Sequence, residues 1–283
     1  MIERLAIVGV GLLGGSLAKA ARAHAIAREI VGIGRDENRL RPALTDGTLD
    51  RITTDLADGL RDADRVVLAA TVLANETLLP AVWRAAAAGA LITDVGSTKR
   101  SIVAAAERLA AGRRDVQFVG SHPMAGSEKS GYAVARADLF QGATVVVTPG
   151  ESNDPTAVKS VTEVWTAVGG RVVTLDPETH DRAVAAISHL PHVVAWALVD
   201  AVARFEPDAF AVAARGFKDT TRIAAADPDM WREILLDNRE ALVASIAAFR
   251  LALDDLERLV ARGDGAALTA LLARVKALRE KVS

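Results

Sequence analysis

The glycine spacing near the amino terminus constrains the fold more than any other feature of this chain. Residues 5–16 read LAIVGVGLLGGS, so a G-x-G-x-x-G pattern directly follows an apolar strand and opens a helical segment. Its glycines permit a tight turn, a close backbone approach to a pyrophosphate, and close packing of the helix on the strand. The pattern also occurs in ordinary tight turns, but its place between a strand and a helix favours a dinucleotide site. We expect cofactor contacts from Gly9, Gly11, Leu12, Leu13 and Gly14.

The first half of the chain alternates β-type runs with helical stretches. Candidate strands cover residues 4–10, 29–34, 64–70, 90–95, 116–120, 143–148 and 171–175. Repeated βα units with apolar strands predict an α/β fold, a Rossmann-like and mostly parallel sheet covered on both faces. After residue 175 the pattern is helical, and Asp227-Pro228 is a typical helix start. We therefore expect a dinucleotide-binding domain over residues 1–176 and an all-helical domain over 177–283.

The composition excludes several kinds of chemistry. The 283-residue chain contains no cysteine, which rules out disulfides and thiolate catalysis and makes a reducing cytoplasm the expected location. The amino terminus lacks the pattern of a signal peptide, and no apolar run approaches the ~20 residues that cross a bilayer. The formal net charge is −2 and no basic stripe is present, so we expect no nucleic-acid or membrane partner.

The end of the second strand bears on the choice of dinucleotide. It reads IVGIGRDEN, with Gly34 at the strand tip and Arg35 after it, where NAD-specific sites usually carry an acidic residue. A small residue followed by a guanidinium suits a 2′-phosphate, so the sequence predicts a preference for NADP. NAD remains the alternative, because Asp36 could swing back toward the ribose and Arg35 could be an ordinary solvated residue.

Histidines are clustered in a chain that has few of them. Four of the five lie in two short segments: His122, His180, His189 and His192. Histidine exchanges protons near neutral pH, so the clustering suggests a site, although the alternative is that His189 and His192 are helix residues bonded to backbone or to each other. The H-x-x-H spacing also fits a metal, but no further ligand falls at a usual spacing, and we expect no metal site. Pro191 should disturb the helix and free a backbone carbonyl near Ile187.

Six motifs in the chain together carry a family resemblance. They are VGVGLLGGS, DVGSTK (94–99), GSHPMAGSEKSG (120–131), LFQGATVVVTP (139–149), HDRAVAAISHLPH (180–192) and GFKDTTRIAAADPDMW (216–231). The combination resembles the prephenate/arogenate dehydrogenase family of tyrosine biosynthesis, over residues 5 to about 250. The resemblance implies a dinucleotide-binding domain followed by a helical domain that forms much of a homodimer interface. One turn departs from the family pattern: Ala70-Thr71-Val72 lacks the usual proline, which weakens the expected cofactor contact from Thr71.

The resemblance implies oxidative decarboxylation of prephenate to 4-hydroxyphenylpyruvate, with hydride transfer to NADP or NAD. His122 would accept the hydrogen of the substrate's ring hydroxyl as a general base. Ser97 would bond the His122 ring or the hydroxyl and fix the tautomer, and it is also a candidate N-cap for the helix at 99–111. Arg222 would hold the ring carboxylate as a bidentate guanidinium. Asp219 would orient Arg222, unless the two form only a surface ion pair.

Further residues are expected to line the same pocket by resemblance: Ser188, His189, His192 and Trp231. Ser127 and Glu128 would contact either the substrate or the partner subunit. Tryptophan just after a helix start is more often a core residue. Lys129 and Tyr132 have no predicted role.

Three alternatives to prephenate oxidation remain open at this point. Arogenate could be the substrate, since no residue here distinguishes its amine from a keto group. A β-hydroxyacid or imine reductase would need a catalytic lysine in the helical domain, where the candidates are Lys218, Lys276 and Lys281. A binding protein that senses NAD(P) would keep the fold without turnover.

Overall fold

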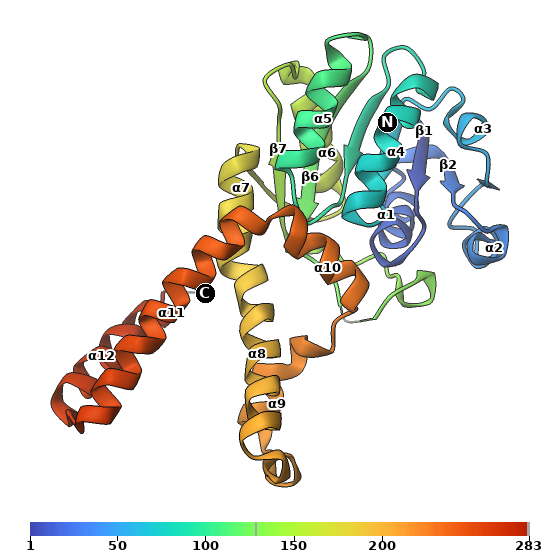
Figure 1. The fold of residues 1–283 in the computed structure, drawn as a ribbon. Coiled ribbons are helices and arrows are strands. Elements are labelled where there is room, and N and C mark those ends of the chain that lie inside the picture. Colours follow the sequence, from blue (N-terminus) through green and yellow to red (C-terminus); the bar gives the residue numbers. More distant parts are fainter. Residues whose placement is uncertain (128, 282–283) are drawn as a thin grey trace. The chain divides into compact units, whose positions relative to one another are not determined.

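The computed structural model describes residues 1–127 and 129–281 (Figure 1). Its sheet consists of β1 (Ile2–Val8), β2 (Ala27–Ile33), β3 (Arg51–Thr53), β4 (Arg65–Leu68), β5 (Leu91–Asp94), β6 (Gln117–Pro123), β7 (Thr144–Thr148) and β8 (Arg171–Thr174). The strand order is β3-β2-β1-β4-β5-β6-β7-β8. All neighbours are parallel except β6 and β7, which are antiparallel. The predicted Rossmann-like α/β class is confirmed.

Seven of these strands lie where the sequence predicts them, within a few residues. The sequence analysis missed β3, because three residues at the sheet edge are too short to show a pattern of alternation. The helices that connect the strands are α1 (Leu12–Ala23), α2 (Glu37–Thr45), α3 (Leu56–Leu60), α4 (Val72–Ala85), α5 (Arg100–Ala110) and α6 (Pro155–Ala167).

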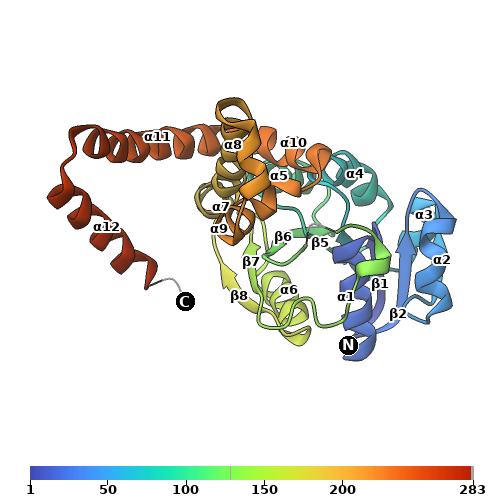
Figure 2. The same cartoon turned by 90° about the horizontal axis from the view of Figure 1, so that it is seen from below.

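Each face of the sheet buries its own apolar core. In β1, Leu5 and Ile7 join a cluster with Leu17 of α1 and Trp165 of α6. The intervening Ala6 and Val8 join a second cluster with residues of α4 and α5. This division follows from the alternation of side chains along a strand, and Figure 2 shows α4 and α5 on the face opposite α1 and α6. Burial on both faces explains the nearly continuous apolar strands.

The chain is helical after β8. The helices are α7 (Pro177–Val184), a π-helical turn (Ala185–His189), α8 (Leu190–Phe205), α9 (Arg215–Thr221), α10 (Pro228–Asp237), α11 (Arg239–Arg262) and α12 (Gly265–Arg279), with short 3₁₀ turns at Pro207–Val212 and Arg222–Ala225. Another 3₁₀ turn, Tyr132–Val134, lies earlier, between β6 and β7. Asp227 caps α10, since its carboxylate accepts from the Met230 amide at 2.9 Å. The irregularity expected before Pro191 is confirmed as the π-helical turn.

The chain divides into two compact units, one covering Met1–Asn238 and the other containing α11 and α12. Helices α7 to α10 therefore share a unit with the sheet, although the predicted change from strands to helices falls near residue 176. One link is between α10 and α4, where the Leu73 amide donates to Glu233 Oε2 at 3.2 Å. All site residues discussed below belong to the first unit.

One helical run in the described residues, Pro177–Phe205, is long and apolar enough to cross a membrane by length and composition alone. Its side chains His180 and Asp181 are buried and hydrogen-bond to β6 and to the start of α5. The run is therefore tied by polar contacts to the sheet domain.

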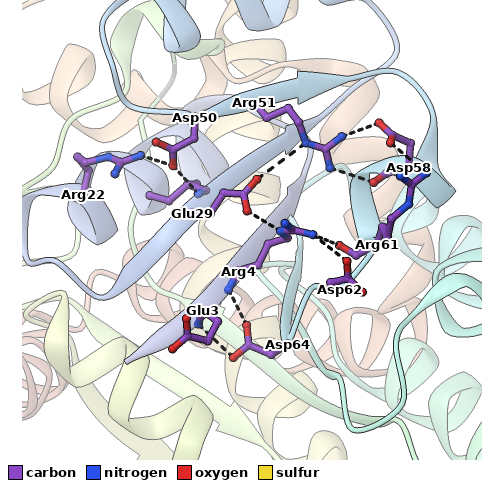
Figure 3. A network of polar contacts seen from close by, with 11 residues as sticks. Glu3, Arg4, Arg22, Glu29, Asp50, Arg51, Asp58, Arg61, Asp62 and Asp64 are labelled. Atoms are coloured by element: carbon purple, nitrogen blue, oxygen red, sulfur yellow. Dashed lines mark hydrogen bonds and ion pairs between the residues drawn. The ribbon is translucent and has the colours of Figure 1, made fainter.

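An ion-pair network ties the amino ends of the first strands together (Figure 3). Glu29 of β2 lies 2.6 Å from Arg4 Nε of β1 and 3.9 Å from Arg51 Nε of β3. Arg51 also pairs with Asp58 of α3 at 2.6 Å. The network stabilises the edge of the sheet that the amino ends of the strands form. Open α/β sheets bind their ligands at the opposite edge, at the carboxyl ends.

Candidate active site

The glycine loop has the shape that its sequence predicts. Gly9 has φ +98°, and a Cβ there would lie 2.7 Å from the Ala69 carbonyl oxygen. A Cβ on Gly14 would lie 2.0 Å from the Gly9 oxygen, so this position needs glycine for the helix to pack on the strand. A Cβ on Gly11 would meet nothing within 4 Å. Open space above Gly11, at the start of α1, is the cradle that a pyrophosphate requires.

The loop lies at the point where the strand order reverses. It follows β1, whose neighbours are β2 on one side and β4 on the other. Crevices at such a switch point bind dinucleotides in doubly wound sheets. Leu12 and Leu13 form the first turn of α1, and Thr71 is the N-cap residue of α4 across the crevice. These residues fit a nicotinamide dinucleotide.

Asn75 stabilises the turn at residues 70–72, which lacks the proline usual in the family, through two hydrogen bonds. Its Oδ1 accepts from the Ala70 amide at 3.0 Å, and its Nδ2 donates to the Leu68 carbonyl at 3.3 Å. The turn between β4 and α4, which contains Thr71, is thus held by a buried side chain.

The tip of β2 leaves a guanidinium at the surface. Gly34 packs beside Leu40, and Arg35 is exposed. Asp36 caps α2 by accepting from the Asn38 amide at 2.9 Å. The carboxylate of Asp36 is therefore already engaged by its own helix.

Two histidines and an aspartate form a buried hydrogen-bonded row. His122 Nδ1 lies 2.9 Å from His180 Nε2, and His180 Nδ1 lies 2.8 Å from Asp181 Oδ1. His122 ends β6, whereas His180 and Asp181 begin the helical part of the chain in α7. Burial lowers the pKa of His122 well below its ordinary value, and the nearby His180, Lys99 and His189 lower it further. His122 is therefore neutral at physiological pH, as a base must be.

Asp181 also caps the helix that follows the DVGSTK motif. Its carboxylate accepts from the amides of Lys99 at 2.8 Å and Arg100 at 3.0 Å. The alternative that Ser97 is the N-cap is wrong, since α5 begins at Arg100 with Lys99 as its cap residue and the capping oxygens come from Asp181. Burial would raise the pKa of Asp181, but these amides and the His180 bond lower it on balance.

A buried ion pair between Lys99 and Asp94 stabilises the ends of β5 and β6. Lys99 has no exposed surface, and its Nζ bonds to Asp94 Oδ2. Asp94 also accepts from the amides of Gly96 at 2.8 Å and Ser121 at 3.0 Å. Asp94 therefore joins the end of β5 to the residue that precedes His122.

Asn238 extends the row toward the predicted pocket residues. Its Nδ2 donates to the Asp181 carbonyl at 2.7 Å and lies 3.3 Å from His189 Nδ1. His189 in turn meets the Trp231 ring edge to face, with centroids 5.9 Å apart. Burial lowers the pKa of His189 to about 4, and the charges of His180 and His192 act in the same direction.

His192 and Arg222 lie at the far end of this set of contacts. The His192 ring stacks on Trp231 at 3.7 Å between centroids, and its Nδ1 lies 3.0 Å from the Ser188 carbonyl. Burial lowers the pKa of His192, and the positive charge of Arg222 lowers it further. Trp231 lines an open pocket of about 630 Å³ together with Trp196, Ala224 and Pro228.

Other predicted positions have different surroundings. Asp219 pairs with Arg215 at 3.2 Å on the exposed face of α9, and its expected role in orienting Arg222 stays a prediction. Ser127 is exposed and accepts from the Lys129 amide at 3.1 Å. Glu128 lies outside the described residues. The role of Ser97 beside His122 stays a prediction. His180 occupies the Nδ1 side of the His122 ring.

The sequence analysis assigned no role to five buried residues of this site: Asp94, Lys99, His180, Asp181 and Asn238. Lys99 and Asp94 were part of the quoted DVGSTK motif, and the adjacent pair His180-Asp181 opens another motif. This adjacent histidine and aspartate were the signal from which the sequence could have predicted their place in the site. Nothing local marks Asn238.

We predict that Gly11→Ala leaves the fold intact but weakens dinucleotide binding, because the added methyl projects into open space that the pyrophosphate would use. Gly9→Ala should instead lower the melting temperature, because it combines a positive φ with a backbone clash. Calorimetric titration with dinucleotide and thermal unfolding separate the two effects. Undiminished binding by the Gly11 variant would contradict the assignment.

Stability should decline in acid because of His189. Its pKa is about 4 in the native state and ordinarily 6.5, so below pH 6.5 the unfolded chain takes up a proton that the native state does not. This contribution is fully present above pH 6.5 and is lost as the pH falls toward 4. Urea unfolding should show the unmodified protein losing about 2 kcal/mol more than His189→Gln between pH 7.5 and 5. Equal losses in both proteins would refute this origin.

Comparison with known proteins supports the same interpretation of the site. Residues 17–174 match the family model described as "Prephenate dehydrogenase, nucleotide-binding domain", and residues 176–274 match "Prephenate dehydrogenase, dimerization domain". Prephenate dehydrogenase of Bacillus subtilis is 38% identical over 250 residues, which are 86% of this chain and 66% of that protein.

Two solved structures are similar over the whole chain. Prephenate dehydrogenase from A. aeolicus, in complex with hydroxyphenyl propionate and NAD+, is 36% identical with a TM-score of 0.93, covering 100% of this chain and 99% of that one. Synechocystis arogenate dehydrogenase is 30% identical with a TM-score of 0.86, covering 99% and 100%. The motif resemblance is thus confirmed, and the chain belongs to the prephenate/arogenate dehydrogenase family, oxidoreductases of tyrosine biosynthesis that use a nicotinamide cofactor.

Proposed function

We propose that this protein oxidatively decarboxylates prephenate to 4-hydroxyphenylpyruvate, with NADP as the preferred hydride acceptor. The observation that carries the proposal is one set of contacts that runs from a neutral, buried His122 through Asp181 and Asn238 to His192. The charge of Arg222 acts on His192 at its far end. These observations support a site that combines a base with a carboxylate-binding cation.

The reaction needs a group that handles the hydroxyl proton. When bound, the nicotinamide ring accepts a hydride from C4 of the substrate ring. His122 takes the proton of the C4 hydroxyl as that carbon becomes a carbonyl. The bond to the ring carboxylate then breaks, CO2 leaves, and its electrons make the ring aromatic and return negative charge to the C4 oxygen. His122 gives the proton back, so the phenol forms without net release of a proton.

Arg222 holds the ring carboxylate in this proposal. A guanidinium stays charged and offers a bidentate fork that suits a planar carboxylate. Ser188, His189, His192 and Trp231 complete the substrate side, and Ser97 lies near the hydroxyl by family resemblance.

Several features support NADP. Arg35 is exposed at the tip of β2, Gly34 before it carries no side chain, and Asp36 is engaged at the start of α2. The relative from A. aeolicus was solved with NAD+, so NAD is the alternative cofactor.

We also infer a cytoplasmic homodimer. The absence of cysteine favours a reducing compartment, and the second family match is to a dimerization domain. Helix α11 exposes Val243, Phe249 and Leu251, which are apolar side chains that a subunit interface would cover.

Arogenate is the second candidate substrate. Among the relatives, a Synechocystis enzyme is named as arogenate dehydrogenase, and one from Zymomonas mobilis as cyclohexadienyl dehydrogenase. The reductase alternative has weaker support, because Lys218 is exposed and Lys276 lies 3.9 Å from Glu280 on α12.

The function is tested by mixing the protein with NADP and prephenate, or arogenate, and following cofactor reduction. His122→Asn should bind dinucleotide normally and lose roughly 10²–10⁴-fold in kcat. Arg222→Ala should mainly raise the KM for prephenate, and Arg215→Ala on the exposed face of α9 is its control. The proposal fails if neither substrate reduces the cofactor, or if the His122 variant turns over at the ordinary rate.

Cofactor choice has its own test. The unmodified protein should have a lower KM for NADP than for NAD, because Arg35 can pair with the 2′-phosphate. Arg35→Ala should raise the KM for NADP and leave that for NAD nearly unchanged. Equal or better use of NAD by the unmodified protein would refute the preference.

A further inference from the structure

We infer that His180 and Asp181 are positioning residues that hold His122 as the Nδ1–H tautomer and so leave its Nε2 as the proton acceptor. This inference rests on the proposed function and deepens it, since it names the atom that acts and the groups that select it.

Asp181 determines the proton position on His180. Its carboxylate accepts from the Lys99 and Arg100 amides at 2.8 and 3.0 Å, which are donors that favour the ionised form. An ionised carboxylate has no hydrogen to give. At 2.8 Å from Asp181 Oδ1, the Nδ1 atom of His180 must therefore carry the hydrogen.

His180 then determines the proton position on His122. A neutral imidazole with hydrogen on Nδ1 is an acceptor at Nε2. That Nε2 lies 2.9 Å from His122 Nδ1, which must donate. Since burial keeps His122 neutral, its own Nε2 bears a lone pair and no hydrogen. The selection of one tautomer by a hydrogen bond at the other nitrogen is how aspartates act on catalytic histidines.

The row is rigid enough to select a tautomer. His180 has no exposed surface, Asp181 is 4% exposed, and both are held at the start of α7. The Asp181 carboxylate is held by the amides at the start of α5, and its backbone carbonyl accepts a 2.7 Å hydrogen bond from Asn238. A purely structural alternative is that Asp181 only caps α5 and that His180 only donates a hydrogen bond to the buried Asp181 carboxylate.

A matched pair of amides separates these roles. In His180→Gln, the longer side chain places an amide where Nε2 was, so its oxygen can accept from His122. In His180→Asn, the shorter side chain places its amide where Nδ1 was, so it can satisfy Asp181 but does not reach His122. The two variants are similar in polarity and differ in which neighbour they serve.

We expect His180→Gln to keep kcat within about tenfold and His180→Asn to lose roughly 10²-fold or more, with dinucleotide affinity and melting temperature similar in both. Rescue by glutamine is the result that a structural role does not produce. Equal kcat values, or a more active asparagine variant, would overturn the inference.

A second measurement, made on the native protein, depends neither on catalytic turnover nor on whether the His180 variants fold. Nitrogen-15 NMR of histidine-labelled protein distinguishes protonated from unprotonated ring nitrogens, and the chain has only five histidines. We expect protonated Nδ1 and unprotonated Nε2 on His122, with the signals assigned from His122→Asn. Hydrogen on Nε2 would overturn the inference even if prephenate is oxidised, and a protein inactive on prephenate would instead fail the proposed function.

Discussion

The Asp181 carboxylate is the interaction on which the rest of the site depends. It caps α5 through two backbone amides and bonds to His180, which in turn meets His122 at the end of β6. The same residue accepts from Asn238 through its carbonyl. Three segments far apart in the sequence, at residues 99–100, 181 and 238, therefore meet at this one residue. A buried carboxylate is stable only when its hydrogen-bonding capacity is filled, so the helical segment that carries Asp181 is held against the sheet.

Burial connects this architecture to the chemistry. The same exclusion of water that stabilises the row keeps His122 and His189 uncharged, and the Lys99 cation beneath them acts in the same direction on His122. Asp94 neutralises Lys99 and joins β5 to β6. Substrate positioning is assigned to the more exposed Arg222 at the far end. In the proposed reaction, proton transfer and substrate binding would thus be served by residues in different dielectric environments.

Sequence patterns predicted the parts of this molecule that depend on local rules. The glycine loop, the strands of the sheet and the start of α10 follow from spacing, alternation and capping, and the structure confirms them. The edge strand β3 was too short to show a period. The partner of His122 was missed because His180 comes 58 positions later in the chain. Spacing suggested Arg222 as the partner of Asp219, and the structure also pairs Asp219 with Arg215, one turn away on the same helical face. Long-range pairing of polar groups leaves no periodic signal, so only the fold reveals it.

The central claim is that a base from the sheet and a cation from the helical segment act on opposite ends of one small acid. A crystal structure with dinucleotide and an inert prephenate analogue that keeps the C4 hydroxyl and the ring carboxylate tests it directly. The account predicts that the hydroxyl lies within hydrogen-bonding distance of His122 Nε2 and that Arg222 binds the carboxylate. An analogue bound with its hydroxyl away from His122, or with its carboxylate held by residues other than Arg222, would contradict it.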